Sequence, residues 1–293
     1  MMLFIEIWQR SICVNKLILT ADSTFDLTPA MAAALDIEVI ASWVRMDSDE
    51  LPDYPDVTMD DLFAFHDRTG KLPQTAAAAP AEYTDFFRRF TDRGDRVLHI
   101  AKSSGMSSCF DNACMAAAEL PGVTVFDSRN ISSGSAMIAV EAARLRDLGL
   151  DGQELLDKLE EYRGRVQGAF IVEDLTYLHK GGRCSSLAHF GANLLHLRPQ
   201  IVIRDGVMSA AKKYRGRFDN CALELIDDML AAPHETGAAY VAHTVTDPQR
   251  LDGYVRYLRE KGGFQRVVAL PAGAAVSCHC GPNTFGVFII KSV

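Results

Sequence analysis

Several features that define whole classes of protein are absent from this sequence. Its seven cysteines are scattered, are odd in number and contain no CxxC pair of the kind that binds zinc. This usage is typical of a reducing environment and speaks against a disulfide-bonded secreted protein. The patterns GxxxxGK[ST] and GxSxG do not occur either, which disfavours nucleotide binding by a P-loop and catalysis by an α/β-hydrolase.

Long apolar runs and a basic surface are also missing. No stretch approaches the roughly 18–20 apolar residues that are needed to cross a membrane. The formal net charge is −8, whereas a nucleic-acid-binding protein carries a basic stripe. This charge does not exclude a small anionic ligand in a local site. The sequence therefore predicts no transmembrane segment and no nucleic-acid partner, and it leaves room for a transient contact with a membrane.

The first residues share only their apolar character with a secretion signal. In residues 1–15, Glu6 and Arg10 interrupt the apolar run, and neither a basic start nor a small-residue cleavage site is present. We interpret residues 1–15 as an extra amphipathic lead-in or a misassigned start, and not as an export signal. A cytoplasmic location is expected.

The first half of the chain alternates strand-like and helix-like segments. Strands are predicted at LILTADST (17–24), IEVIASWV (37–44), RVLHI (96–100) and GVTVFDS (122–128). Helices are predicted after Thr28-Pro29, between Thr58 and Gly70, and at about 108–120 and 132–148. Strands separated by helices predict a parallel sheet with helices on both faces.

Hydroxyl groups are concentrated where ligands bind in such sheets, in the loops at the carboxyl ends of the strands. These loops are ADST, SSGMSSC and DSRNISSG. Ser103 and Ser104 lie just after a buried strand and just before a helix, whose N-terminal amides and partial positive charge suit a carboxylate. Asp22 and Ser23 follow the first strand in the same way.

A further hydroxyl comes from the segment KLPQTAAAAPAEY (71–83). Pro80 stands where a helix begins, and an apolar stripe follows at i, i+3, i+4 and i+7, formed by Tyr83, Phe86, Phe87 and Phe90. The alanines before Pro80 are therefore expected in a smooth loop or short turn. Thr75 stands at the head of this small-residue surface, where a ligand can approach closely.

The second half of the chain predicts another α/β unit with a mixed sheet. Strand-like runs recur at 166–174, 200–213, 237–244, 265–270 and 285–290, and Asp205-Gly206 is a hairpin signal. Helices are expected near 217–231 and 247–261. A charged helix ends near Arg165. We therefore predict an N-terminal α/β domain at residues 16–165, a C-terminal α/β domain at residues 166–293, and a cleft between them.

Ordered motifs give the chain a resemblance to a known family. They are ADSTFDL (21–27), PQTAAAAP (73–80), IAKSSGMSSCFDNA (100–113), EDLTYLHKGGRCS (173–185), AKKYRG (211–216) and HCGPNTFG (279–286). In this order and at these spacings, the chain from residue 16 onward resembles the DegV family of bacterial fatty-acid-binding proteins. It departs from the family pattern at Ala76, where a serine usually follows the threonine.

The resemblance implies a two-domain carrier that binds a long-chain fatty acid and presents it to a fatty acid kinase, which makes acyl-phosphate for phospholipid synthesis. Such a carrier is not an enzyme and needs no cofactor, no metal and no catalytic residue. The motifs imply loop contacts from Asp22, Ser23 and Gly281. They also imply a set of side chains that bind the carboxylate, namely Thr75, Ser103, Ser104 and His279.

Each of these residues also has a simpler interpretation. Ser103 and Ser104 are typical helix-capping residues, and Thr75 alone would be an ordinary loop threonine. His279 fits a buried structural histidine, and Asp22 fits the chemistry of a strand end. Only the ordered set of motifs favours ligand binding.

Basic residues on this acidic chain allow two interpretations. Arg183, Lys213 and Arg215 are expected either on a solvated face with surface ion pairs or at a docking site for the kinase. Arginine suits phosphate and carboxylate geometry, and Arg215 matches a family position of this kind by resemblance. We therefore favour Arg215 as the main docking residue.

The alternative function is a lipid-active hydrolase that uses a loop serine or Cys109 as nucleophile and His279 as base. Cys278 and Cys280 flank His279, which raises the question of a metal. If this segment is a strand, the two thiols share one face and the imidazole points to the other. No second pair of ligands is visible, so we predict no metal site.

Overall fold

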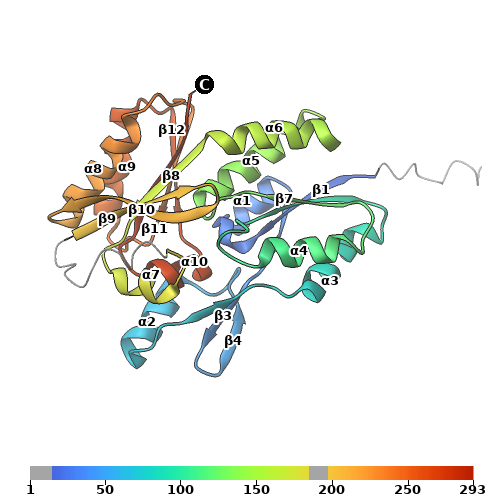
Figure 1. Cartoon of the computed structure of the whole chain (residues 1–293), viewed down its shortest axis with the longest axis horizontal. Coiled ribbons are helices and arrows are strands. Elements are labelled where there is room, and N and C mark those ends of the chain that lie inside the picture. The colour runs from blue at the N-terminus through green and yellow to red at the C-terminus, as the bar shows by residue number, and fades with distance from the viewer. Residues whose placement is uncertain (1–14, 185–196, 293) are drawn as a thin grey trace, which may run out of the picture.

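The computed structural model describes residues 15–184 and 197–292 and has an α/β fold, shown in Figure 1. All but the last residue of the predicted lead-in therefore lies outside the described residues. Within the described ranges, no helix has the length and apolar character that spanning a bilayer requires.

The first sheet consists of four parallel strands in the order β2-β1-β6-β7. They are β1 (Leu17–Asp22), β2 (Ile37–Ile40), β6 (Arg96–Ala101) and β7 (Val123–Asp127). The two central strands, β1 and β6, are buried over almost their whole length, as expected for strands that are covered on both faces. The predicted parallel sheet is confirmed.

Helices cover both faces of this sheet, because successive residues of a strand point to opposite sides. The helices are α1 (Pro29–Ala34), α3 (Pro80–Thr91), α4 (Cys109–Ala117), α5 (Ser133–Asp147) and α6 (Gly152–Arg165). Helices α3 and α4 pack on the face that carries Ile18 and Val97. Helices α1, α5 and α6 pack on the face that carries Leu19 and Leu98.

Local sequence signals set the ends of several helices. Helix α3 begins at Pro80, and its predicted apolar stripe is buried. Helix α2 (Met59–Thr69) begins after Thr58, whose Oγ1 accepts a hydrogen bond from the N–H of Asp61, and the Asp61 carboxylate accepts one from the N–H of Thr58. The helix ends at Gly70, which adopts a φ of 70°.

The second large sheet is mixed, with strand order β10-β9-β8-β13-β11-β12. Its strands are β8 (Val166–Ile171), β9 (Leu197–Arg204), β10 (Val207–Arg215), β11 (Ala238–His243), β12 (Arg266–Pro271) and β13 (Phe285–Ile290). Strands β11 and β12 are parallel, and the other neighbours are antiparallel. The predicted hairpin turns at Asp205 and Gly206, whose φ angles of 51° and 81° both lie in the left-handed region.

The two large sheets share part of their core. Helices α8 (Phe218–Leu230) and α9 (Pro248–Gly262) cover one face of the second sheet. The opposite face packs on α5, where Met137 and Ile138 belong to one buried cluster with Leu98 of the first sheet and Phe288 of the second. Helix α5 therefore lies between the sheets (Figure 1). The predicted division after residue 165 falls between α6 and β8, and as a domain boundary it stays a prediction.

A third, small sheet was not expected from the sequence. It has the order β4-β3-β5 and consists of β3 (Trp43–Met46), β4 (Asp49–Pro52) and β5 (Gln74–Ala76). The single strand predicted at 37–44 is wrong: the chain leaves the parallel sheet after Ile40 and enters β3 at Trp43. The reason is tertiary, because the N–H of Ser42 donates to Asp53 and Ser23 and not to a neighbouring strand.

Candidate functional site

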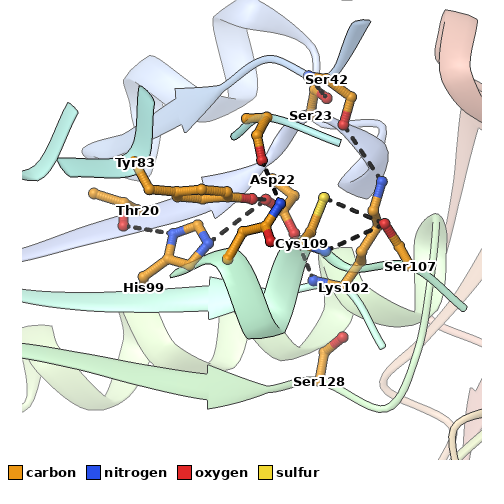
Figure 2. Close-up of polar contacts among 12 residues, drawn as sticks. Thr20, Asp22, Ser23, Ser42, Tyr83, His99, Lys102, Ser107, Cys109 and Ser128 are labelled. Carbon is orange, nitrogen blue, oxygen red and sulfur yellow. Dashed lines mark hydrogen bonds and ion pairs between the residues drawn. The ribbon is translucent and has the colours of Figure 1, made fainter. Parts of the chain in front are cut away.

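Polar side chains gather at the carboxyl ends of β1 and β6, as Figure 2 shows. The Asp22 carboxylate accepts hydrogen bonds from the Tyr83 hydroxyl at 2.5 Å and from the N–H of Lys102 at 2.7 Å. His99 Nε2 lies 3.5 Å from the same carboxylate, and His99 Nδ1 lies 2.9 Å from Thr20 Oγ1. Burial acts to raise the pKa of Asp22, but His99, Lys102 and Tyr83 together lower it. Asp22 is thus ionised, and both of its carboxylate oxygens are bonded within the protein, which gives it a structural role.

The Ser23 hydroxyl belongs to a second buried contact. It donates to Asp53 Oδ2 at 2.9 Å and accepts from the N–H of Ser42 at 3.1 Å. Burial raises the pKa of Asp53 to about 6, although the hydrogen bond from Ser23 and the charge of Lys102 oppose this rise. Ser23 and Asp22 therefore hold the chain where β1 ends, and neither lines the cavity described below.

Ser103 and Ser104 do not line that cavity either. Ser103 is fully buried, and its Oγ donates to the carbonyl oxygen of Gly206 at 2.5 Å. Ser104 is exposed, and its Oγ donates to Asp127 Oδ2 at 2.6 Å. Each hydroxyl is already bonded within the protein, so this geometry does not support either serine as a ligand for a carboxylate. Their contacts tie the loop after β6 to the β9–β10 hairpin and to β7.

A cavity of about 270 Å³ lies beside these loops. Its polar part is formed by Thr24, Thr75, Lys102, Ser107, Ser108, Arg183 and His279. Its apolar part includes Ile131, Leu178, Met208 and Val276. These residues come from both halves of the chain, so the cavity lies where the two predicted domains meet.

Thr75 and His279, which are 204 positions apart, meet in the cavity wall. Thr75 lies on β5, where it pairs with Val44, and His279 lies near the end of helix α10 (Ala274–Cys280). Thr75 Oγ1 is 2.9 Å from His279 Nε2. The structure thus brings together two of the four residues predicted to bind the carboxylate.

Helix α7 (Leu175–Gly181) packs on α10 and limits how His279 can move. A Cβ atom at Gly181 would lie 2.5 Å from His279 Nδ1, so only glycine leaves room for the imidazole. At the end of α10, a Cβ atom at Gly281 would lie 2.5 Å from the ring of Tyr177. Gly181 of the GGR motif and Gly281 of the CGPN motif therefore have a packing role beside the cavity, and Gly281 itself does not line it.

The segment around His279 is helix α10 and not a strand, so the condition under which the two thiols share one face is not met. Cys278 and Cys280 are therefore not on one face of a strand. Cys278 is buried with Val44 and Leu62, whereas Cys280 packs with Val276 at the cavity. Among residues 15–184 and 197–292, no group of His, Cys, Asp and Glu side chains could hold a metal ion.

The electrostatics of the cavity keep His279 neutral. Burial lowers the pKa of His279 to about 4, and the charges of Arg183 and Lys102 contribute in the same direction. Its Nδ1 is buried and has no hydrogen-bond partner among the described residues. Because an unpaired buried N–H is especially unfavourable, we infer that the proton is on Nε2 and is donated to Thr75 Oγ1. The hydroxyl proton of Thr75 is then free to donate into the cavity.

A second cavity of about 30 Å³, lined mostly by apolar residues, adjoins the first. The two share Ile131, Met208, Val276 and Cys280, so these residues form the junction. Beyond the junction, Phe170, Ala242, Gly286 and Phe288 of the second sheet line the apolar cavity. The site therefore has a polar end near Thr75 and His279 and an apolar extension between α10 and the second sheet.

The three basic residues predicted for docking lie in two places. Arg183 follows α7, lines the cavity and donates to the carbonyl oxygen of Gly181 at 2.6 Å. Lys213 and Arg215 are exposed near the end of β10. Arg183 therefore belongs to the cavity, and the other two form a separate surface.

Sequence reasoning missed Thr24, Lys102, Ser107 and Ser108 as lining residues. One signal could have identified Lys102, since it is a charged residue directly after a strand that is otherwise mostly apolar. No sequence pattern distinguishes Ser107 and Ser108 from Ser103 and Ser104. Their orientation depends on the turn that begins at Ser103.

Comparisons with known proteins agree over nearly the whole chain. A family model described as "Uncharacterised protein, DegV family" matches residues 16–292. A DegV domain-containing protein of Clostridium acetobutylicum is 29% identical over 284 residues, which cover 95% of this chain and 99% of that protein.

Solved structures give the same result. A DegV family protein from Thermus thermophilus, described for its fatty acid binding, superimposes with a TM-score of 0.86 at 25% identity and covers 94% of this chain and 100% of its own. A DegV lipid-binding protein from Thermotoga maritima superimposes with a TM-score of 0.83 at 25% identity and covers 94% and 98%.

Proposed function

The chain belongs to the DegV family, and on this premise we propose that it binds a long-chain fatty acid between its two large sheets and presents it to a fatty acid kinase. The observation that carries the proposal is the adjacency of two cavities: a cavity with a hydroxyl and an imidazole at one end shares four wall residues with an apolar cavity. An amphiphile with an acidic head and a long apolar tail fits this arrangement of a polar cavity beside an apolar one.

The head group is assigned to the polar end. A carboxylate there accepts the hydroxyl proton of Thr75, which His279 orients through its Nε2. Hydrogen bonds to a charged group contribute roughly 1.5–3 kcal/mol each, against about 1 kcal/mol for neutral ones. The small side chains of Ala76 and Ala77, which also line the cavity, let the ligand come close to Thr75.

The tail supplies most of the affinity. Burying a CH₂ group contributes about 0.8 kcal/mol, so about 14 of them give on the order of 11 kcal/mol before costs. Association costs an estimated 4–15 kcal/mol. We assign the tail to the junction and to the apolar cavity, whose walls, Phe170, Phe288 and their neighbours, must move apart to admit it, because about 30 Å³ is the volume of about one water molecule.

The site favours binding over hydrolysis. A histidine that acts as general base must become positively charged, but burial, Arg183 and Lys102 all disfavour its protonated form and hold the pKa of His279 at about 4. No carboxylate orients Nδ1 within the described part of the chain. Cys109 is fully buried and contacts Ser107, while His279 contacts Thr75. We therefore propose a carrier, with exchange to the kinase in the bacterial cytosol.

Substitution of Thr75 tests the assignment of the head group. Delipidated wild-type protein is expected to bind hexadecanoate with one site per chain in calorimetry. Thr75→Ala should weaken binding by about 1–3 kcal/mol because a hydrogen bond to a charged group is lost. Thr75→Ser keeps the hydroxyl and is the matched control. Wild-type protein that ignores hexadecanoate would refute the function, whereas an unchanged dissociation constant for Thr75→Ala would refute only this role of Thr75.

The kinase step is assigned to the surface at the end of β10. Arg215 is exposed and makes no ion pair among the described residues, whereas Arg217 lies near Asp219. Arginine binds phosphate and carboxylate groups with two parallel hydrogen bonds, which suits docking to a nucleotide-binding partner.

Arg215→Ala should leave the affinity for hexadecanoate unchanged and slow acyl-phosphate formation by the kinase with ATP about ten-fold. Arg215→Lys should recover part of the rate because charge remains without the planar fork. Added salt should slow the wild type more than the alanine variant. Arg256, exposed on α9, gives the control Arg256→Ala. Full turnover of Arg215→Ala at low salt would exclude Arg215 from docking.

A further inference from the structure

One buried charge of the cavity is not used by the proposed function. Lys102 follows β6 directly and is only 7% exposed. Its backbone position is held by the hydrogen bond from its N–H to Asp22. Its side chain lines the cavity that contains Thr75 and His279. The residue is therefore placed by the sheet and directed to the ligand site.

The ammonium group of Lys102 has few partners for a buried charge. Its Nζ donates to Ser42 Oγ at 3.3 Å, as Figure 2 shows. An ammonium group has three donors, and a buried charge is unfavourable unless it is paired and hydrogen-bonded. Within residues 15–184 and 197–292, no carboxylate forms an ion pair with it, although Asp22 and Asp53 are close enough to respond to its charge.

The two nearby carboxylates are occupied by other donors. Asp22 is bonded to Tyr83 and to the Lys102 N–H, and Asp53 is bonded to Ser23 and to the Ser42 N–H. The cavity wall adds positive charge from Arg183 and no carboxylate. The unpaired donors of Lys102 thus face a cavity whose electrostatics favour an anion.

We propose that the ammonium group of Lys102 forms an ion pair with the acidic head group of the bound lipid, so that the site selects an anionic amphiphile over a neutral one of the same length. This inference rests on the proposed function. It adds a charged specificity residue to the neutral donor Thr75, which His279 orients. Thr75 fixes the orientation of the head group, and Lys102 sets the requirement for negative charge.

The test compares two ligands that differ only in the head group. Hexadecanoate and hexadecanol are titrated into delipidated wild-type protein and into Lys102→Met, Lys102→Gln and Lys102→Arg. Loss of the ion pair should weaken hexadecanoate binding about ten- to hundred-fold in the Met and Gln variants. Hexadecanol binding should change by less than about three-fold, because no charge is involved. Lys102→Arg should keep most of the preference for the acid.

The control is Lys158→Met, which removes the same formal charge from an exposed position on α6. It should bind both ligands like the wild type. Lys102→Gln retains a donor for Ser42, so it keeps the test valid if the methionine variant does not fold. Equal loss of both ligands would assign Lys102 a purely structural role and overturn the proposal. Unchanged hexadecanoate binding would overturn it as well, while wild-type protein that binds neither ligand would overturn the proposed function itself.

Discussion

Ile131→Trp is expected to weaken hexadecanoate binding by at least about a hundred-fold while octanoate binding changes by less than about three-fold. Ile131 lines both cavities and packs with Val276 and Cys280 at their junction. An indole at this position fills the junction that the tail must cross on the proposed path. A long tail then loses its buried methylenes, each of which contributes about 0.8 kcal/mol, whereas a short tail does not reach the junction.

Two variants make this result specific. Ile131→Val keeps the passage open and should bind hexadecanoate within about three-fold of the wild type. Met208→Trp blocks the junction from β10 and should reproduce the selective loss of the long chain. Isothermal titration with acids of increasing length provides the measurement. If Ile131→Trp binds hexadecanoate like the wild type, the tail does not pass Ile131. If it loses octanoate equally, the head-group end has been disturbed.

The second large effect concerns stability and pH. Asp26 is buried and accepts hydrogen bonds from Ser132 and from the N–H of Gly273 at 2.8 Å. These partners precede α5 and α10, so Asp26 ties the loop after β1 to the helix that carries His279. Burial raises the pKa of Asp26 to about 7, although both hydrogen bonds oppose the rise. Between the unfolded pKa of 3.8 and the folded pKa of about 7, the folded protein therefore holds a proton at Asp26 that the unfolded chain has released.

Because the pKa of Asp26 is raised in the folded state, its contribution to the free energy of unfolding decreases as pH rises. The stabilising effect of the bound proton is fully present below the unfolded pKa of 3.8 and is lost as pH rises to about 7. A shift of about 3 units corresponds to at most about 4 kcal/mol. Asn at position 26 does not titrate, tolerates the φ of 57°, and can accept from Gly273 while it donates to Ser132.

The free energy of unfolding of Asp26→Asn, measured in urea, should therefore rise relative to the wild type between pH 5 and pH 8 by at most about 3 kcal/mol, because only the interval from pH 5 to the folded pKa of about 7 contributes in this range. Titration of His279 and Asp53 also changes stability with pH, but it does so in both proteins and largely cancels when their free energies of unfolding are subtracted. Asp252→Asn, at an exposed position of α9, is the control and should show no such change with pH. A pH-independent difference for Asp26→Asn would mean that Asp26 is ionised in the fold throughout this range.

Much of the fold could be predicted because its signals are local. Pro80 and the stripe after it determine α3, and the pair Thr58 and Asp61 determines the start of α2. The turn at Asp205-Gly206 needs two residues that tolerate positive φ, and the sequence contains such a pair at the right place. Apolar segments alternating with helices were sufficient to predict a parallel sheet followed by a mixed one.

The candidate site could be predicted only in part. Thr75 and His279 were selected through the ordered motifs, and the structure brings them to 2.9 Å. Ser103 and Ser104 were selected by the same reasoning, but their hydroxyls bond to Gly206 and Asp127. A serine at a strand end is compatible with a ligand, a helix cap or a tertiary contact, and the choice depends on partners far away in the chain.

The amino-acid sequence by itself therefore determined the class of fold, the main elements and the hydroxyl-rich loops, because periodicity, capping and turn chemistry act over a few residues. The tertiary structure decided where the strand at 37–44 breaks, that His279 lies on a helix, and that the Lys102 side chain lines the cavity. These features depend on contacts such as Ser42 with Asp53 and Lys102 with Ser42, which join segments that no local pattern relates. These contacts form only when both large sheets pack around α5. That packing decides which polar groups are bonded within the protein and which face a ligand.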